Sequence, residues 1–176
     1  TRAGSLALHE IVLEDHPRLL LFLPLAHCFA RFIQYASIAS DDGVVGYLPD
    51  TKTLLPDLRS FEPTYLLGVP RVFEKVYNAA SQKAGAGIQG HIFAQSVKHF
   101  VKWSKDEQAG RGHSFIERMR HSFYMATVGK SIRSALGPNL KWLACGGAPL
   151  NVDLAHFFNG MNDITFIQGY GMTETA

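Results

Sequence analysis

Residues 166–176 have the sequence FIQGYGMTETA, in which an apolar run gives way abruptly to a polar turn with spaced glycines. Residues 165–167 are β-branched or aromatic, which is the composition of a buried strand. Gly169 and Gly171 flank Tyr170, and glycine lets a ligand approach the backbone where a Cβ would otherwise stand. The pattern predicts a strand that ends at a binding loop.

Thr173 and Glu174 supply the polar groups of this loop. A hydroxyl and a carboxylate just past the carboxyl end of a strand suit phosphate oxygens and a hard divalent cation. The alternative is an ordinary strand-to-helix loop, in which Thr173 caps the helix and Glu174 occupies its first turn. From the residues alone, the two interpretations stand equal.

An alternation of strands and helices precedes the loop. Composition and apolar spacing predict helices at 26–39 and 54–61, a helix capped by Asn151, and strands at 19–23, 43–48, 65–69, 142–145 and just before Gly169. Strands that alternate with helices favour parallel crossovers. The fold class predicted is therefore α/β, a mostly parallel sheet with flanking helices.

A helical insertion interrupts this alternation at about residues 71–137. Helical spacing is predicted to end at Gly85, Gly87 and Gly90, to resume over 92–101, and to resume again over 115–136 after a flexible connector at 106–113. We expect one α/β domain, with the motif-bearing strands in residues 19–70 and 141–176.

Four polar or glycine-rich segments follow predicted strands: His27, Pro70 with Arg71, Gly146 with Gly147, and residues 170–174. Ligands of open parallel sheets collect beyond the carboxyl ends of the strands. We therefore expect the four segments to form a single crevice, although the pattern leaves the strand order open.

Four motifs, in this order, resemble those of the adenylate-forming superfamily, which contains acyl-CoA synthetases, luciferase-like enzymes and peptide-synthetase adenylation domains. They are an acyl-pocket motif at 22–27 (FLPLAH), a segment typical of long-chain fatty acyl-CoA synthetases at 68–75 (GVPRVFEK), an adenine-side loop at 146–150 (GGAPL) and the core motif at 168–175 (QGYGMTET). The resemblance covers residues 19–176 and implies an adenylation-domain fold.

The resemblance also implies a reaction and its site. Such enzymes activate a carboxylate with ATP and Mg²⁺ and then pass the acyl group to a thiol; here it implies a long-chain fatty acid, with CoA as co-substrate. By resemblance, Glu174 binds the metal, and His27, Thr173 and Glu174 are catalytic. The residues implied to bind ATP or AMP are Gly146, Gly147, Ala148, Pro149, Gln168, Gly169, Tyr170, Gly171 and Thr173.

Three residues are assigned to the acyl substrate by the same resemblance: His27, Phe29 and Arg71. Each has an ordinary structural alternative. An isolated histidine is more often a core or capping residue, an aromatic residue at helical spacing more often belongs to the core, and an arginine at a helix start can extend along the surface.

Composition restricts the remaining functions. The 176 residues suit one compact domain, and the longest apolar run, 19–26, is too short to span a bilayer. Cys28 and Cys145 form neither a disulfide framework nor a metal cluster, no secretion signal is visible, and no nucleic-acid-binding module is present. We expect a cytoplasmic protein.

The net charge of +2 conceals an asymmetry. Residues 83–141 contain ten Lys or Arg against three acidic residues, about +7, which leaves about −5 elsewhere. Such a basic segment could contact an anionic membrane surface or the phosphates of CoA, although a solvated helical surface is commoner. Peripheral membrane contact is thus an open alternative.

Several family features are absent from the sequence: the phosphate-gripping loop, the ribose-binding aspartate, and the C-terminal domain with its catalytic lysine. We therefore expect an internal fragment of an adenylation domain that is inactive alone, with its oligomeric state open. The rival functions are a fatty acyl-AMP ligase that feeds a carrier protein, and a non-catalytic α/β module that binds a nucleotide or partner.

Overall fold

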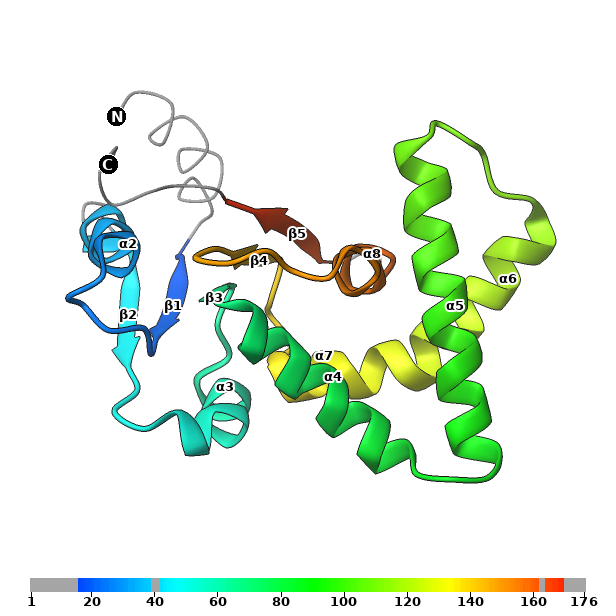
Figure 1. The fold of residues 1–176 in the computed structure, drawn as a ribbon, viewed down its shortest axis with the longest axis horizontal. Helices are drawn as coiled ribbons and strands as arrows, with labels where there is room; N and C mark the ends of the chain where they lie inside the picture. Colours follow the sequence, from blue (N-terminus) through cyan, green and yellow to red (C-terminus); the bar gives the residue numbers. More distant parts are fainter. Residues whose placement is uncertain (1–15, 39–41, 162–163, 170–176) are drawn as a thin grey trace.

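The computed structural model describes residues 16–38, 42–161 and 164–169, except the side chains of Phe29 and Ala36. Five parallel strands form one sheet in the order β2-β1-β3-β4-β5 (Figure 1). They are β1 (Arg18–Leu21), β2 (Val44–Tyr47), β3 (Tyr65–Gly68), β4 (Trp142–Cys145) and β5 (Thr165–Gln168). The predicted α/β class and parallel sheet are confirmed.

Helices connect consecutive strands. They are α2 (Cys28–Ile38), the short 3-10 turn η1 (Thr51–Thr53), α3 (Leu54–Phe61), α4 (Pro70–Ala84), α5 (Ile88–Gln108), α6 (Phe115–Tyr124), the π-helical turn η2 (Met125–Gly129), α7 (Lys130–Leu136) and α8 (Val152–Asn159). The predicted cap of α8 is confirmed, because the Asn151 side chain accepts hydrogen bonds from the Asp153 and Leu154 amides at 2.9 and 3.2 Å.

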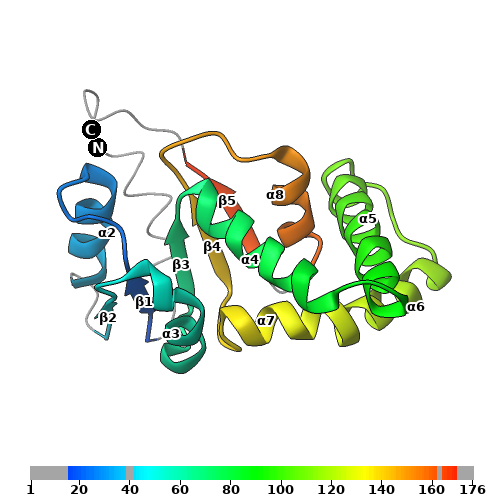
Figure 2. The same ribbon diagram turned by 60° about the horizontal axis from the view of Figure 1, so that its bottom comes forward.

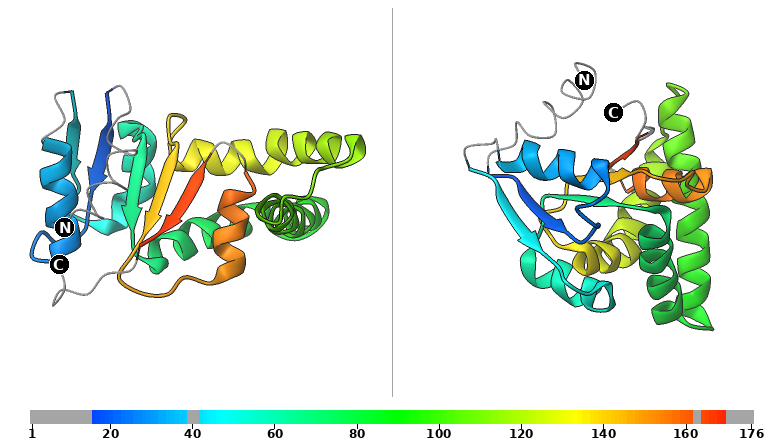
Figure 3. Two further views of the ribbon diagram at one scale, coloured as in Figure 1. Left: turned by 90° about the horizontal axis from the view of Figure 1, so that it is seen from above. Right: turned by 60° about the vertical axis from the view of Figure 1, so that its left-hand side comes forward.

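The sheet is covered on both faces. Leu19, Leu21, Tyr65 and Leu67 pack with Ala30 and Ile33 of α2 on one face. The alternate positions pack against α3, α4, α5, α7 and α8 on the other face, and they include Leu20, Leu66, Leu143 and Phe166. The right-hand view of Figure 3 shows α2 on one side and α3, α4 and α7 on the other. Burial on both faces explains why the strands read as nearly continuous apolar runs.

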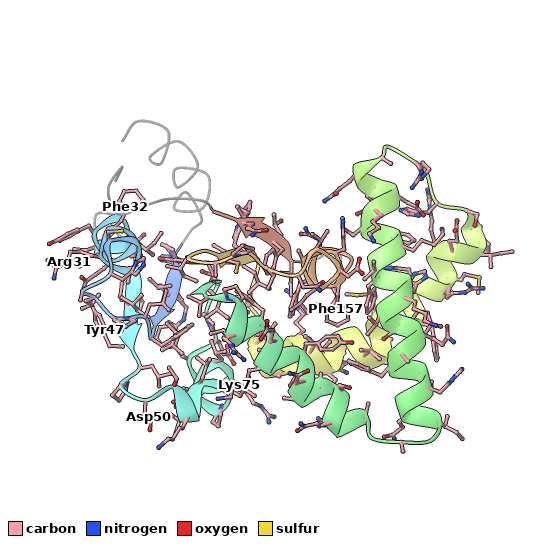
Figure 4. All side chains as sticks on the ribbon, viewed as in Figure 1. Arg31, Phe32, Tyr47, Asp50, Lys75 and Phe157 are labelled. Carbon is pink, nitrogen blue, oxygen red and sulfur yellow. The ribbon has the colours of Figure 1, made fainter. Side chains whose placement is uncertain are left out.

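The stretch between β3 and β4 extends the molecule sideways. Figures 1 and 2 show α5 and α6 beyond the β5 edge of the sheet, on the side away from α2. Phe157 of α8 packs against both α4 and α5, since its ring lies 5.3 Å from Tyr77 and 5.9 Å from Phe100 between centroids (Figure 4). Edge-to-face aromatic contacts of this kind stabilise a core beyond simple burial.

The predicted break at Gly90 was wrong. Gly85 and Gly87 separate α4 from α5 with positive φ angles of 62° and 85°, whereas Gly90 lies inside α5. A Cβ at Gly90 would stand 2.2 Å from the Gly85 carbonyl oxygen. The glycine at this position therefore permits a close approach of the backbone rather than a turn.

Two further helix predictions need correction. Helix α5 continues to Gln108, beyond the predicted end at Val101, because Trp103 extends its buried face. The predicted helix over 115–136 is one helical stretch with a π-helical turn between α6 and α7. Its start is fixed by a capping box, in which the Ser114 amide donates to Glu117 Oε2 at 3.0 Å.

Candidate active site

The strand order places a topological switch point between β1 and β3. These neighbouring parallel strands lead to opposite faces, since β1 is followed by α2 and β3 by α4. Their connections therefore diverge at the carboxyl edge of the sheet and leave a crevice, which is where open α/β sheets bind ligands. His27 and Arg71 belong to these two connections.

The segments after β3, β4 and β5 are brought together at the same edge. Gly68, Cys145 and Gln168 are in register across the three strands. The ladder continues past the strands, because the Gly146 amide donates to the Gly68 carbonyl at 3.1 Å and the Gly169 amide to the Cys145 carbonyl at 2.8 Å. The structure thus places the predicted nucleotide segments 146–149 and 168–169 side by side.

Gly147 has a conformation that favours glycine. Its φ is +82°, in the region that L side chains rarely adopt, and the residue is exposed together with Ala148 and Pro149. Gly169 is exposed too, and a Cβ there would meet no atom closer than 3.9 Å. Both backbones are therefore open to a flat group that approaches from the edge.

A narrow apolar hollow lies on the α2 face of the sheet, over β3, β4 and β5. It is lined by Ile33, Tyr65, Leu66, Leu67, Trp142, Ala144 and Ile167, and its free space is small, about 20 Å³. Ala144 lies between Leu67 and Ile167 in the sheet register. Because alanine is the smallest of the three, it forms the floor of the hollow.

Two hydroxyl groups near the hollow are hydrogen-bonded to each other. The Ser37 hydroxyl donates to the Ile33 carbonyl at 2.8 Å, so the Tyr65 hydroxyl donates to Ser37 Oγ at 2.5 Å. Burial raises the pKa of Tyr65, although its hydrogen bond to Ser37 opposes the rise. The wall is therefore suited to an alkyl chain rather than to a charged group.

His27 lies in the turn that precedes α2. Its amide donates to the Pro24 carbonyl at 3.0 Å, and its side chain is exposed. Figure 4 shows Arg31 and Phe32 on the outer side of α2, away from the sheet. The role of His27 beside an acyl carboxylate stays a prediction, and the side chain of Phe29 lies outside the described residues.

Arg71 lies away from the hollow, on the other face of the sheet. Its side chain is 91% exposed at the start of α4, on the opposite face from α2, and its Nη1 lies 4.0 Å from Glu74 Oε2. An exposed pair at this distance contributes little to stability. Arg71 does not line the hollow, so its assignment to the acyl substrate also stays a prediction.

The remaining predicted residues, Tyr170, Gly171, Thr173 and Glu174, lie outside the described residues. Within the described ranges, no group of three or more His, Cys, Asp or Glu side chains could hold a metal ion. The Mg²⁺ assignment to Glu174 therefore remains a prediction from resemblance.

Cys145 is the last residue of β4, next to the glycine segments. Burial raises the pKa of its thiol to about 11, so the thiol stays protonated.

Sequence reasoning missed the residues that line the hollow. Tyr65, Trp142, Ala144 and Ile167 were interpreted only as strand positions. Their period-two spacing within each strand could have assigned them to one face. Their proximity across strands required the order β3-β4-β5.

Comparison with known proteins identifies relatives of the chain. The chain is 43% identical over 173 residues to the long-chain-fatty-acid–CoA ligase FadD15 of Mycobacterium bovis, an alignment that covers 98% of this chain and 28% of that protein. It is 33% identical to long chain acyl-CoA synthetase 1 of Arabidopsis thaliana, over 89% of this chain and 23% of that one. The chain thus spans about a quarter of the length of these relatives.

Solved structures show the same fold at lower identity. The adenylation domain of a carboxylate reductase from Mycobacterium chelonae superimposes with a TM-score of 0.61 at 19% identity, covering 88% of this chain and 20% of that one. The family model for AMP-binding enzymes matches residues 2–176, nearly the whole sequence. The chain therefore belongs to the AMP-binding enzyme family.

Proposed function

We propose that the full-length protein is an ATP-dependent long-chain fatty acyl-CoA synthetase. The observation that carries the proposal is the 43% identity over 173 residues to a long-chain-fatty-acid–CoA ligase, and an apolar hollow on β3, β4 and β5, the strands whose ends carry the glycine segments, supports it. An alkyl chain in the hollow would bring its carboxylate toward the edge where a nucleotide can approach. The two substrates would thus meet at the carboxyl ends of β3, β4 and β5.

The reaction has two balanced steps. The fatty acid carboxylate oxygen attacks the α-phosphorus of ATP, a P–O bond forms, and pyrophosphate leaves with the electron pair of the broken bond. The sulfur of CoA then attacks the acyl carbonyl, AMP leaves, and the thiol proton passes to solvent. Positioning and neutralisation of the anions carry most of the catalytic effect in such steps.

The roles that we propose for the residues are those that the family resemblance implies. Gly146, Gly147 and Ala148 would lie against the adenine, because the exposed loop with its positive-φ glycine leaves room for a flat base. Tyr170 would stack on the base from the adjacent loop. His27, which precedes α2, would orient the acyl carboxylate.

Mg²⁺ would neutralise the phosphate oxygens, with Glu174 as its protein ligand and Thr173 beside a phosphate. The described residues hold no competing metal site. A single carboxylate that acts together with substrate phosphates suits Mg²⁺, which keeps several waters and seldom has an all-protein cage.

ATP–pyrophosphate exchange by the full-length protein, with and without hexadecanoic acid, tests the first step. We expect acid-dependent exchange that Glu174→Gln abolishes and that the matched control Glu107→Gln, at an exposed position of α5, retains. If a folded full-length protein shows no exchange, the proposed function is refuted. If Glu174→Gln leaves the exchange unaffected, the metal assignment is refuted.

The acceptor is tested separately. With preformed hexadecanoyl-adenylate, CoA should yield hexadecanoyl-CoA and AMP in equal amounts. Transfer to a carrier protein but not to CoA would instead identify an acyl-AMP ligase, which shares the first step.

A further inference from the structure

Helix α6 carries an apolar stripe on its outer surface. Phe115, Ile116, Met119 and Phe123 are 77%, 69%, 60% and 52% exposed. A helix turns by about 100° per residue, so these four positions share a sector about 100° wide. Four large apolar side chains together on one surface helix are more than the scattered exposure that is normal for a folded protein.

Two arginines flank the stripe. Arg120 lies about 40° beyond one edge of the sector and Arg118 about 60° beyond the other, at about 100° per residue. Both are exposed, and within the described ranges neither guanidinium forms an ion pair, in contrast to Arg111, which lies 2.7 Å from Asp106. The outer surface of α6 is therefore apolar at its centre and cationic on both sides.

The opposite side of α6 is fixed against α5. The ring of His121 stacks on Trp103 at 4.0 Å between centroids, and Trp103 stacks in turn on His113 at 3.4 Å. Glu117 Oε1 accepts from Lys102 Nζ of α5 at 2.9 Å. These contacts hold the helix in one orientation, so the apolar stripe cannot turn inward.

The acidic groups nearest to α6 are already paired with cations. Asp106 is bound by Lys102 and Arg111, and Glu117 by Lys102. Lys105 is paired in turn with Asp153 of α8, so no carboxylate in the described residues forms an ion pair with Arg118 or Arg120. An anionic surface complements this charge, whereas a neutral apolar protein groove would leave Arg118 and Arg120 without partners.

We propose that α6 is an interfacial helix that docks the protein on an anionic lipid bilayer. The stripe enters the boundary between headgroups and acyl chains, and Arg118 and Arg120 contact lipid phosphates, as amphipathic helices with cationic flanks do. The helix lies on the surface and does not cross it, because no helix in the described part of the chain is long and apolar enough to span a bilayer.

Vesicle sedimentation with the full-length protein tests the proposal. The vesicles contain phosphatidylcholine alone or equal amounts of phosphatidylcholine and phosphatidylglycerol. Phe115→Ser with Met119→Ser should lower partitioning about tenfold or more on the anionic vesicles, because the helix loses two of the four side chains of the stripe. Arg118→Gln with Arg120→Gln should lower it about fivefold per arginine, about thirtyfold together, and the loss should shrink at high salt.

Matched controls lie elsewhere on the surface. Val152→Ser removes an apolar side chain that is 67% exposed on α8, and Arg59→Gln with Lys83→Gln removes two exposed charges from α3 and α4. Neither control should change partitioning by more than about twofold. All variants should retain ATP–pyrophosphate exchange measured without vesicles, which separates this proposal from the proposed reaction.

A fluorescence experiment distinguishes a bilayer from a protein cover. Tryptophan introduced as Phe115→Trp should emit as an exposed indole in buffer and should be quenched by brominated lipids on anionic vesicles, whereas Val152→Trp should not be quenched. Blue-shifted emission of Phe115→Trp without vesicles would mean that another protein surface or a second copy covers α6. That result, or equal vesicle binding by the apolar, cationic and control variants, would overturn the proposal.

Discussion

Ala144→Leu should shorten the acyl chain that the protein can activate. Ala144 forms the floor of the apolar hollow between Leu67 and Ile167, and it is partly exposed there. A leucine at this position projects three additional carbon atoms into the space that we assign to the alkyl chain. The substitution therefore competes with the substrate for the same volume.

The magnitude follows from the displaced surface. If three methylenes of the substrate lose their buried site, at about 0.8 kcal/mol each, the transition state for a long acid loses about 2.4 kcal/mol. This corresponds to a fall of about sixtyfold in kcat/KM for hexadecanoate. Butanoate, whose chain is too short to use the same contacts, should lose less than about threefold.

The assay is ATP–pyrophosphate exchange by the full-length protein with each acid at subsaturating concentration. Ala94→Leu makes the same change at an exposed position of α5 and should leave both acids unaffected. Thermal melts of each variant show whether the sheet tolerates the added volume. An equal loss for both acids would indicate distortion, and unchanged kcat/KM for hexadecanoate in a folded variant would place the alkyl chain elsewhere.

Three further predictions concern stability and reactivity. The Ser114 amide is the main group that lowers the pKa of Glu117 to about 2 from its usual 4.5. The contribution of Glu117 to stability is therefore present above pH 4.5 and is lost as the pH falls toward 2. The melting temperatures of wild type and Glu117→Gln should converge over this range. Gly160→Ala should lower the free energy of unfolding by about 1–3 kcal/mol in urea titrations, because its Cβ would stand 2.1 Å from the Phe100 carbonyl oxygen. Burial raises the pKa of Cys145 to about 11, so iodoacetamide should label this thiol only after unfolding, as measured by peptide mass spectrometry.

The glycine prediction has a matched reference. Gly112→Ala introduces a Cβ with no atom within 4 Å and should change stability far less than Gly160→Ala. Equal effects at the two glycines would contradict the packing argument. A constant difference between wild type and Glu117→Gln down to pH 2, or rapid native labelling of Cys145, would contradict the assigned pKa shifts.

Local sequence patterns predicted most elements of the fold. The strand at Trp142–Cys145 and the helix at Leu54–Phe61 have the predicted bounds, because composition and apolar spacing act over short distances. The prediction failed at Gly90, where the Gly85 carbonyl explains the glycine. It also missed the π-helical turn at Met125–Gly129, for which the apolar period gave no signal.

The sequence by itself determined the α/β class, the parallel strands and the family, since each depends on residue types and spacing along the chain. The family resemblance also predicted a nucleotide site at residues 146–149 and 168–169, and the structure places these two segments side by side at one edge of the sheet. Only the tertiary structure decided the order β2-β1-β3-β4-β5 and the apolar hollow. Likewise, it alone showed that the stripe on α6 faces outward. The physical reason is that these features depend on which surfaces are buried against one another. The apolar spacing within one strand or helix shows which of its faces is buried, but not which distant segment covers that face.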